Sequence, residues 1–473
     1  MRVWAALAGA LAAAAPTPAA AHAFAERYDL PLPLGFYLAG AGAAVALSFL
    51  GSSLLMRPGR LALRELAVPL PPGAARAARW LLRAVALALL AAVIVTALAG
   101  PASPTRNFAT VFVWVIWWVG FVLFTALVVD LWSAANPFRL LVERMLRVAG
   151  LGRRERPLPA TAGWLAVAGL LAIAWLELVS DWAEQPRALA ALVAVYFAGL
   201  VAGAALMGPA GWFAAADPLT RIFGLLGRLA PLEARGGVLR VRLPGAGLIG
   251  FDPGAPGAVF VLALIGTVLF DGLSETPFWA AVLDWVTRSE AVRPWLLALR
   301  DGGVDILKLV RTCGLLATVA AAVLSYAALS LAMARSAGAA GDAPGAGRVF
   351  TRFAASLLPI AVAYHLAHYA SYLVLAGQLM LPILSDPLGL GWDLIGTANR
   401  RIDLGVIDAR AVWWIAAAAL VTGHALSVFV AHAEALSLYG DGRRAVRSQL
   451  PMMVCMVGLT GLSLWILSQP IVA

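Results

Sequence analysis

The chain has 473 residues, of which 62% are hydrophobic and 13% are charged. This composition excludes an ordinary soluble domain and is typical of a protein that crosses the membrane many times. The net charge of +10 comes with arginines that lie between hydrophobic segments, which favours topology signals over a nucleic-acid recognition module. Both cysteines, Cys313 and Cys455, lie in apolar stretches, so no disulfide framework is expected.

Residues 1–21 have the pattern of a cleavable signal peptide. Arg2 precedes an Ala- and Leu-rich stretch that is too short for a stable span, and small residues follow up to Ala21. Cleavage there would make His22 the mature amino terminus of an external segment, residues 22–34. A free amino-terminal histidine can chelate copper through its amine and its ring nitrogen, so His22 is a candidate metal ligand. The alternatives are an uncleaved anchor and an incidental histidine.

We predict that residues 35–473 form an integral membrane domain with ten hydrophobic segments. These cover approximately residues 35–56, 84–100, 108–131, 161–180, 188–208, 257–275, 312–334, 353–380, 411–437 and 449–470. Alternate connections carry most of the arginines, which places those connections in the cytoplasm. We therefore predict an all-α, polytopic transmembrane helix bundle in a bacterial inner membrane. Ten spans after an external start place both termini in the periplasm.

A weak internal repeat follows the third and fifth segments. Residues 132–139 have the sequence WSAANPFR, and residues 212–221 have the similar sequence WFAAADPLTR. Asn136 and Asp217 have the pattern of helix N-caps followed by proline at the first helical position. We expect each to start an amphipathic helix at the cytoplasmic interface.

The ends of the fourth and sixth segments share a second sequence similarity, a pair of acidic residues. Glu177 and Asp181 are four residues apart, as are Asp271 and Glu275, so each pair lies on one helix face. Together the four carboxylates are suited to binding cations or to general acid/base catalysis. The alternative is that they mark the water boundary and are solvated from a vestibule.

Histidines inside the last hydrophobic segments are the main candidate ligands, because polar groups in the hydrocarbon core are costly. His365 and His368 share one helix face, with Tyr369 and Tyr372 nearby, and His424 of the next segment can meet them near mid-membrane. The three could bind a transition metal, zinc or copper, and leave a position open for water. Two of them could instead hold a b-type haem. The alternative is that the histidines bind no cofactor and form structural hydrogen bonds.

Several stretches resemble a family of bacterial membrane proteins whose members are often labelled fenitrothion hydrolase. They are residues 22–34, the NPFR turn at 136–139, residues 270–277 and the two histidine-bearing segments. The resemblance extends over essentially the whole chain and implies a polytopic architecture. It also implies hydrolysis of an organophosphate triester, but it brings no set of catalytic residues.

The sequence thus leaves three functions open. A metal-dependent hydrolase would use the histidines to hold a metal that activates water, with Glu177 or Asp271 as the base. A transition-metal or proton-coupled transporter would use polar groups at successive depths. A redox protein would bind haem at His365 and His424. The expected partners are the lipid bilayer, a small apolar or metal-ion ligand and a possible membrane or periplasmic protein, and no nucleic acid.

Overall fold

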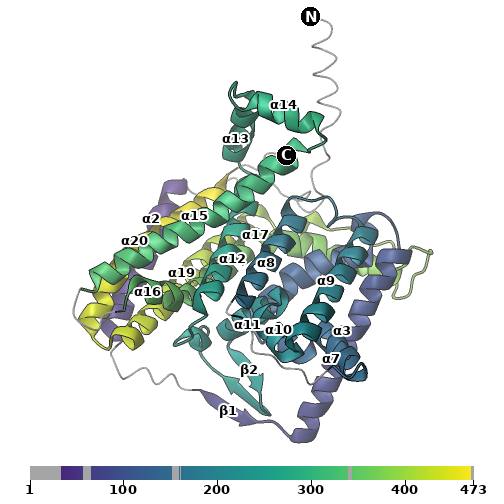
Figure 1. Ribbon diagram of the computed structural model, residues 1–473, viewed down its shortest axis with the longest axis horizontal. Coiled ribbons are helices and arrows are strands. Elements are labelled where there is room, and N and C mark those ends of the chain that lie inside the picture. Colours follow the sequence, from purple (N-terminus) through teal and green to yellow (C-terminus); the bar gives the residue numbers. More distant parts are fainter. Residues whose placement is uncertain (1–32, 57–64, 152–158, 160, 339–343, 470–473) are drawn as a thin grey trace, which may run out of the picture.

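The computed structural model describes residues 33–56, 65–151, 159, 161–338 and 344–469. The predicted signal peptide and His22 lie outside these residues, so both stay predictions. Within the described chain, nine helical segments are long and apolar enough to cross a membrane (Figure 1). The predicted all-α, polytopic helix bundle is therefore confirmed.

The nine segments follow the chain in order. They are α2 (Leu34–Leu55), α3 (Pro72–Ala99), the composite α4–η3–α5 (Phe108–Leu127), α9 (Pro186–Met207), α12 (Gly254–Ser274), α15 (Ile306–Ser336), the composite α16–η5–α17–η6–α18 (Ala346–Ser385), α19 (Ala409–Tyr439) and α20 (Gly442–Ser468). In the third segment the stretch η3 (Phe112–Phe121) is a π-helix. In the eighth, α17 (Leu358–Ala376) is the main α-helix.

The structure differs from the predicted segments mainly at two places, and three other spans begin six or seven residues earlier than predicted. The predicted segment 161–180 forms α8 (Ala162–Leu178), whose 17 residues give a length of about 26 Å, less than the hydrocarbon core. Helix α3 begins at Pro72, twelve residues before the predicted 84, because a proline at the first turn starts the helix and Arg76, Arg79 and Arg83 extend it beyond the apolar stretch.

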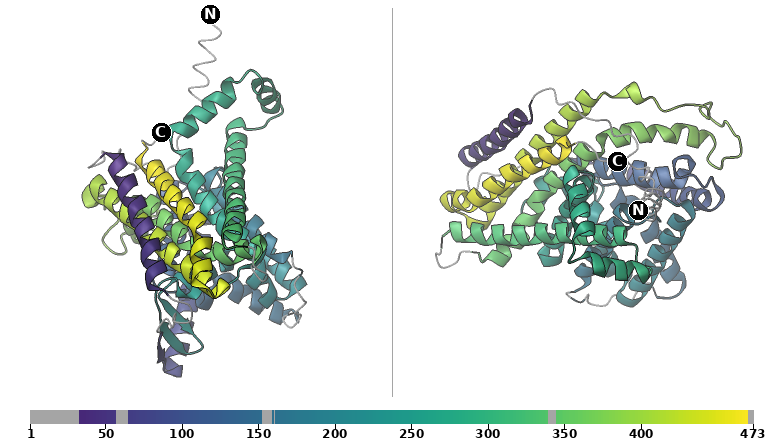
Figure 2. Two further views of the ribbon diagram at one scale, coloured as in Figure 1. Left: turned by 90° about the vertical axis from the view of Figure 1, so that its left-hand side faces the viewer. Right: turned by 90° about the horizontal axis from the view of Figure 1, so that it is seen from above.

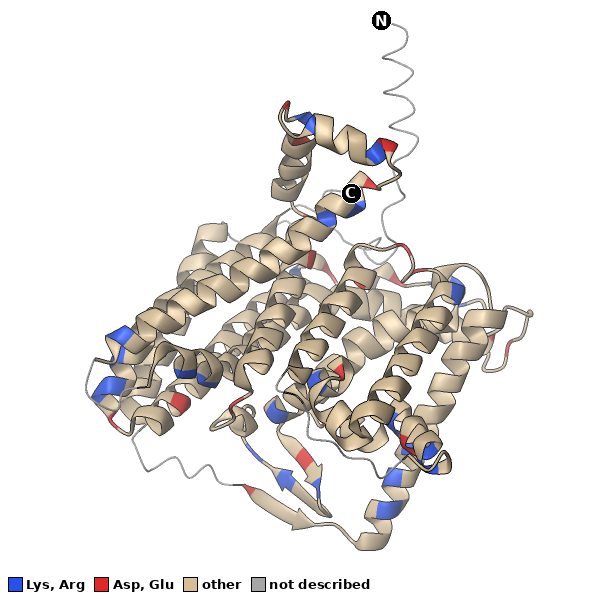
Figure 3. Ribbon diagram, viewed as in Figure 1, with Lys and Arg blue, Asp and Glu red and all other residues tan. Residues whose placement is uncertain are grey.

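Opposite faces of the bundle carry different additions (Figures 1 and 2). One face, called here the sheet face, carries the antiparallel sheet β1–β3–β2. Its strands are β1 (Leu66–Pro69), β2 (Leu232–Arg235) and β3 (Val238–Val241). The other, called here the hairpin face, carries α13 (Pro277–Arg288) and α14 (Arg293–Asp301). Charged residues gather toward the helix ends and these additions, and long central stretches of the helices have none (Figure 3). This distribution is the one a bilayer imposes.

The repeat seen in the sequence is a structural repeat. After the third span, α6 (Trp132–Ala135) leads into α7 (Pro137–Val148), and after the fifth, α10 (Pro209–Ala215) leads into α11 (Pro218–Leu229). The side chains of Asn136 and Asp217 accept the backbone N–H groups that begin α7 and α11, so both predicted caps are confirmed. Asn136 Nδ2 also lies 3.3 Å from Thr220 Oγ1, which joins the two copies.

Both copies of the repeat run in the same direction. The first comprises the third span, α6, α7 and α8, and the second comprises α9, α10, α11 and α12. Residues 179–185 are the short connection between them, so the second copy starts at the face where the first ends. Helices α8 and α12 pack against each other, which brings the equivalent ends of the two copies together.

Candidate functional site

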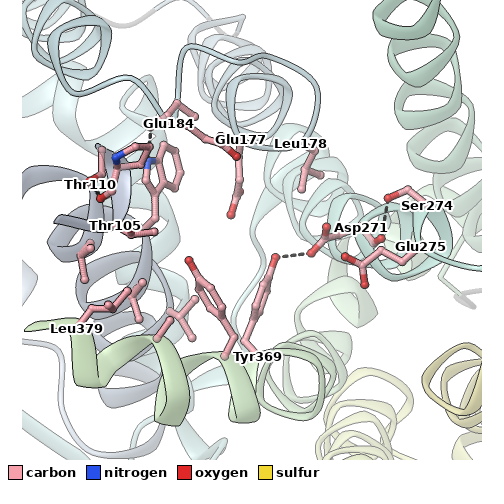
Figure 4. Close-up of a pocket in the computed structure, with 18 of the residues that line it drawn as sticks. Thr105, Thr110, Glu177, Leu178, Glu184, Asp271, Ser274, Glu275, Tyr369 and Leu379 are labelled. Carbon is pink, nitrogen blue, oxygen red and sulfur yellow. Dashed lines mark hydrogen bonds between the residues drawn. The ribbon is translucent and has the colours of Figure 1, made fainter. Parts of the chain in front are cut away.

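The ends of α8 and α12 form one wall of a cavity of about 140 Å³ (Figure 4). Its polar or charged lining residues are Thr105, Thr110, Glu177, Glu184, Asp271, Ser274, Glu275, Arg311, Tyr369 and Tyr372. Glu177 comes from the first repeat and Asp271 from the second, and Figure 4 shows both carboxylates directed into the same space. Four carboxylates against one arginine make this cavity suited to cations.

Asp271 is the most connected residue of the site. It is 3% exposed, and its Oδ2 lies 2.9 Å from His368 Nε2. The Tyr369 hydroxyl donates a hydrogen bond to the same oxygen. The ring of His368 also packs edge-on against Tyr369, with centroids 4.7 Å apart. A carboxylate held by a histidine and a tyrosine inside an apolar bundle can share a proton with either neighbour.

Glu177 lies opposite this group and interacts with it electrostatically. Its carboxylate also interacts with the side chain of Trp118 from the π-helical segment. A second cavity, of about 70 Å³, continues from Glu177, Asp271 and Tyr369 toward Ile222 and Leu226 of α11. Glu177, Asp271 and Tyr369 line both cavities, so the two cavities are adjacent. The second cavity extends from these polar groups toward the sheet face, where α11 lies.

Three of the four predicted carboxylates therefore meet at one cavity, and Asp181 does not line it. Asp181 Oδ2 lies 2.5 Å from Lys308 Nζ, and the aspartate side chain is 66% exposed. The i, i+4 spacing stacks Asp181 with Glu177 only while the helix continues, and α8 ends at Leu178.

The three histidines of the predicted metal site have different surroundings. His368 is bonded to Asp271, and His365 packs its ring 4.8 Å from that of Tyr369. His424 is fully buried, and its Nδ1 lies 2.8 Å from Leu420 O of its own helix. Among the described residues, no group of three or more His, Cys, Asp or Glu side chains is arranged to hold a metal ion. Zinc or copper binding therefore stays a prediction.

Within the part of the chain that the structure describes, a haem between His365 and His424 has no cavity of matching size beside His365. The cavity there is the one of about 70 Å³, whereas sites for organic ligands have roughly 300 Å³ or more. The haem also stays a prediction.

Two charged residues of the cavity were not singled out from the sequence. Glu184 lies in the connection between α8 and α9, and Arg311 lies one turn inside α15. No local pattern marks Glu184, and Arg311 has the sequence context of a topology signal. Their place at the cavity depends on packing between distant helices.

The fold and the site define a polytopic helical membrane protein with an acidic cluster that bears a histidine, inside the bundle. Comparison with protein-family models, with curated proteins and with solved structures finds no match.

Proposed function

We propose that this protein is a proton-coupled membrane transporter whose coupling site is the group Glu177, Asp271, His368 and Tyr369. The observation that carries the proposal is the meeting of Glu177 and Asp271, which are equivalent residues of two repeats, at one cavity inside the bundle. Ionisable groups within a membrane domain commonly mark proton paths, and transporters are often built from internal repeats with the site at the repeat interface.

The chemistry of the site supports proton binding. The two carboxylates face each other in an apolar bundle, so a proton on either relieves their repulsion. His368 and Tyr369 give the proton two further places within hydrogen-bonding distance of Asp271. The cavities of about 140 and 70 Å³ are large enough for water and small solutes.

A proton-flux measurement tests this function. The full chain would be reconstituted into liposomes that contain a pH-sensitive dye, and the internal pH followed after an external acid pulse with the membrane potential clamped. We expect acidification that Glu177→Gln and Asp271→Asn each slow at least tenfold. Glu143→Gln is the matched control, because Glu143 pairs with Arg139 on α7 at the sheet face, away from the cavity. Equal flux in all variants, or flux no faster than in empty liposomes, would contradict the proposal.

Hydrolysis of an organophosphate triester is the second candidate. Glu177 lines the cavity and can serve as a general base, and the resemblance given in the sequence analysis implies the same reaction. The Glu177 carboxylate would take a proton from water while the water oxygen bonds to phosphorus. The bond from phosphorus to the aryl oxygen breaks, and the leaving oxygen receives the proton. Release of the aryl alcohol from fenitrothion by the wild type, but not by Glu177→Gln, would support this function over transport.

A further inference from the structure

A third cavity, of about 460 Å³, lies on the other side of the π-helical segment from the acidic site. It is walled by α3, η3, α8, α9 and the turn from α6 into α7, and its lining is almost wholly apolar. Trp118 of η3 lines both this cavity and the narrow one beside Glu177. A space of this size and lining, in a membrane domain, fits an apolar chain.

The cavity is elongated along the helices, as an acyl chain in a bilayer would be. Its wall on α3 runs from Leu82 to Val93, which is about 16 Å along the helix. On η3 and α9 the wall reaches Phe112 and Leu189, each about one turn from the hairpin-face end of its span. The opposite end is lined by Trp132 and Ala135, which precede the amphipathic helix α7 of the sheet face. A chain in this cavity would therefore have its ester end near the sheet face and its tip toward the hairpin face.

The end at the sheet face offers a hydrogen-bond donor with no partner. Trp132 is 6% exposed, and within the described residues its indole Nε1 has no acceptor. A buried N–H without an acceptor costs free energy, so this group points to a ligand or water that accepts its proton. An ester carbonyl at the head of an acyl chain is such an acceptor, and tryptophan is enriched at that depth of the bilayer.

Basic side chains lie just beyond this end. Arg79 precedes Leu82 by three residues and Arg83 precedes Ala86 by three, so both arginines continue the cavity-lining face of α3 toward the sheet face. The Nε of Arg83 donates to Ala134 O at 3.2 Å, which fixes the arginine beside this end. A guanidinium has five N–H donors and binds phosphate well.

We propose that this cavity is the binding site of one anionic phospholipid. Its acyl chain fills the apolar space, its ester carbonyl accepts from Trp132 Nε1, and its phosphate and acidic headgroup lie against Arg79 and Arg83. Basic pockets between membrane helices bind anionic headgroups in the same way. The lipid would hold η3 against α3 and so fix the position of Trp118 beside Glu177.

Lipid binding by the delipidated full chain in detergent tests the proposal. The probes are phosphatidylglycerol and phosphatidylcholine with matched, brominated acyl chains, and the readout is quenching of intrinsic tryptophan fluorescence. The wild type should show saturable quenching with a clear preference for phosphatidylglycerol. Trp132→Phe keeps the ring and removes the donor, so both lipids should bind about fivefold more weakly, as expected for one neutral hydrogen bond. Joint replacement of Arg79 and Arg83 by glutamine should abolish the preference.

A matched pair of α3 variants tests the cavity itself. Ala86→Leu puts a larger side chain into the cavity, whereas Ala84→Leu adds the same atoms on the exposed side of the helix. Both changes suit a helix, so neither should unfold the protein. We expect Ala86→Leu alone to remove saturable binding. Equal behaviour of the two variants, equal affinity of the wild type for both lipids, or unsaturable quenching would overturn the proposal.

Discussion

A buried ion pair near the sheet face gives the sharpest stability prediction. The Glu434 side chain on α19 is 2% exposed and that of Arg352 on α16 (Ala346–Ala354) is 17% exposed. Glu434 Oε1 accepts from Arg352 Nε at 2.5 Å, and its Oε2 accepts from the backbone N–H of Gly250 at 2.7 Å. The pair therefore joins α19, α16 and the loop before α12. Replacing Arg352 by methionine would leave a buried carboxylate with the Gly250 N–H as its remaining partner.

The expected cost of Arg352→Met is about 3–5 kcal/mol in the free energy of unfolding, because the remaining charge stays desolvated. Reversible unfolding in mixed micelles, followed by circular dichroism, measures it. Arg288→Met is the control, since its pair with Asp284 is exposed and contributes about 0.5 kcal/mol or less. Adding Glu434→Met to Arg352→Met should recover part of the loss. A cost below about 1 kcal/mol, or no recovery, would refute the reasoning.

Three further variants test other parts of the fold. Asp217→Ala should lower the free energy of unfolding by about 2 kcal/mol, because this buried cap also accepts a hydrogen bond from the Tyr196 hydroxyl at 2.5 Å. Chemical unfolding measures this free energy, and an unchanged value would contradict the capping role. Gly423→Ala should destabilise strongly, since its Cβ would lie 2.2 Å from a methyl group of α17. Gly461→Ala should not, since its Cβ would meet Leu38 Cδ2 at 4.0 Å, an ordinary contact. The melting temperatures of the two variants test this difference. Backbone N–H bonds lower the pKa of Asp386, so its contribution is present at neutral pH and lost as the pH falls through that lowered value. Protection of the loop amides from hydrogen exchange, measured relative to the intrinsic rate at each pH, should fall below about pH 4, with no acid step in Asp386→Asn.

Hydrophobicity was sufficient to predict the nine long spans, because each must satisfy its own backbone hydrogen bonds in an apolar environment. Their ends were harder to place. Helix α3 continues through Arg76, Arg79 and Arg83, which can leave the apolar region while the backbone stays helical. The sheet was not predicted, since β1 and β3 pair across more than 160 residues and their four-residue strands carry little periodicity.

The site was predicted in part for a similar reason. The repeat in the sequence pointed to Glu177 and Asp271, and the packing of α8 on α12 brings these two residues to the same region of the structure. Helix spacing and expected depth in the membrane suggested that His365, His368 and His424 lie together, but they did not suggest the hydrogen bond between His368 and Asp271, 97 residues away. Side-chain partners across helices depend on rotation about each helix axis, which a hydropathy pattern does not specify.

The repeat explains why acidic groups are tolerated inside an apolar bundle. Each copy alone would place one carboxylate near the end of a helix, where water can reach it. Packing of two copies in the same direction turns these ends toward each other, and residues from other helices then supply the partners: Tyr369 and His368 from α17 and Trp118 from η3. The two carboxylates cannot both be charged at low cost in this setting, and this cost is the physical basis of the proton binding that we propose.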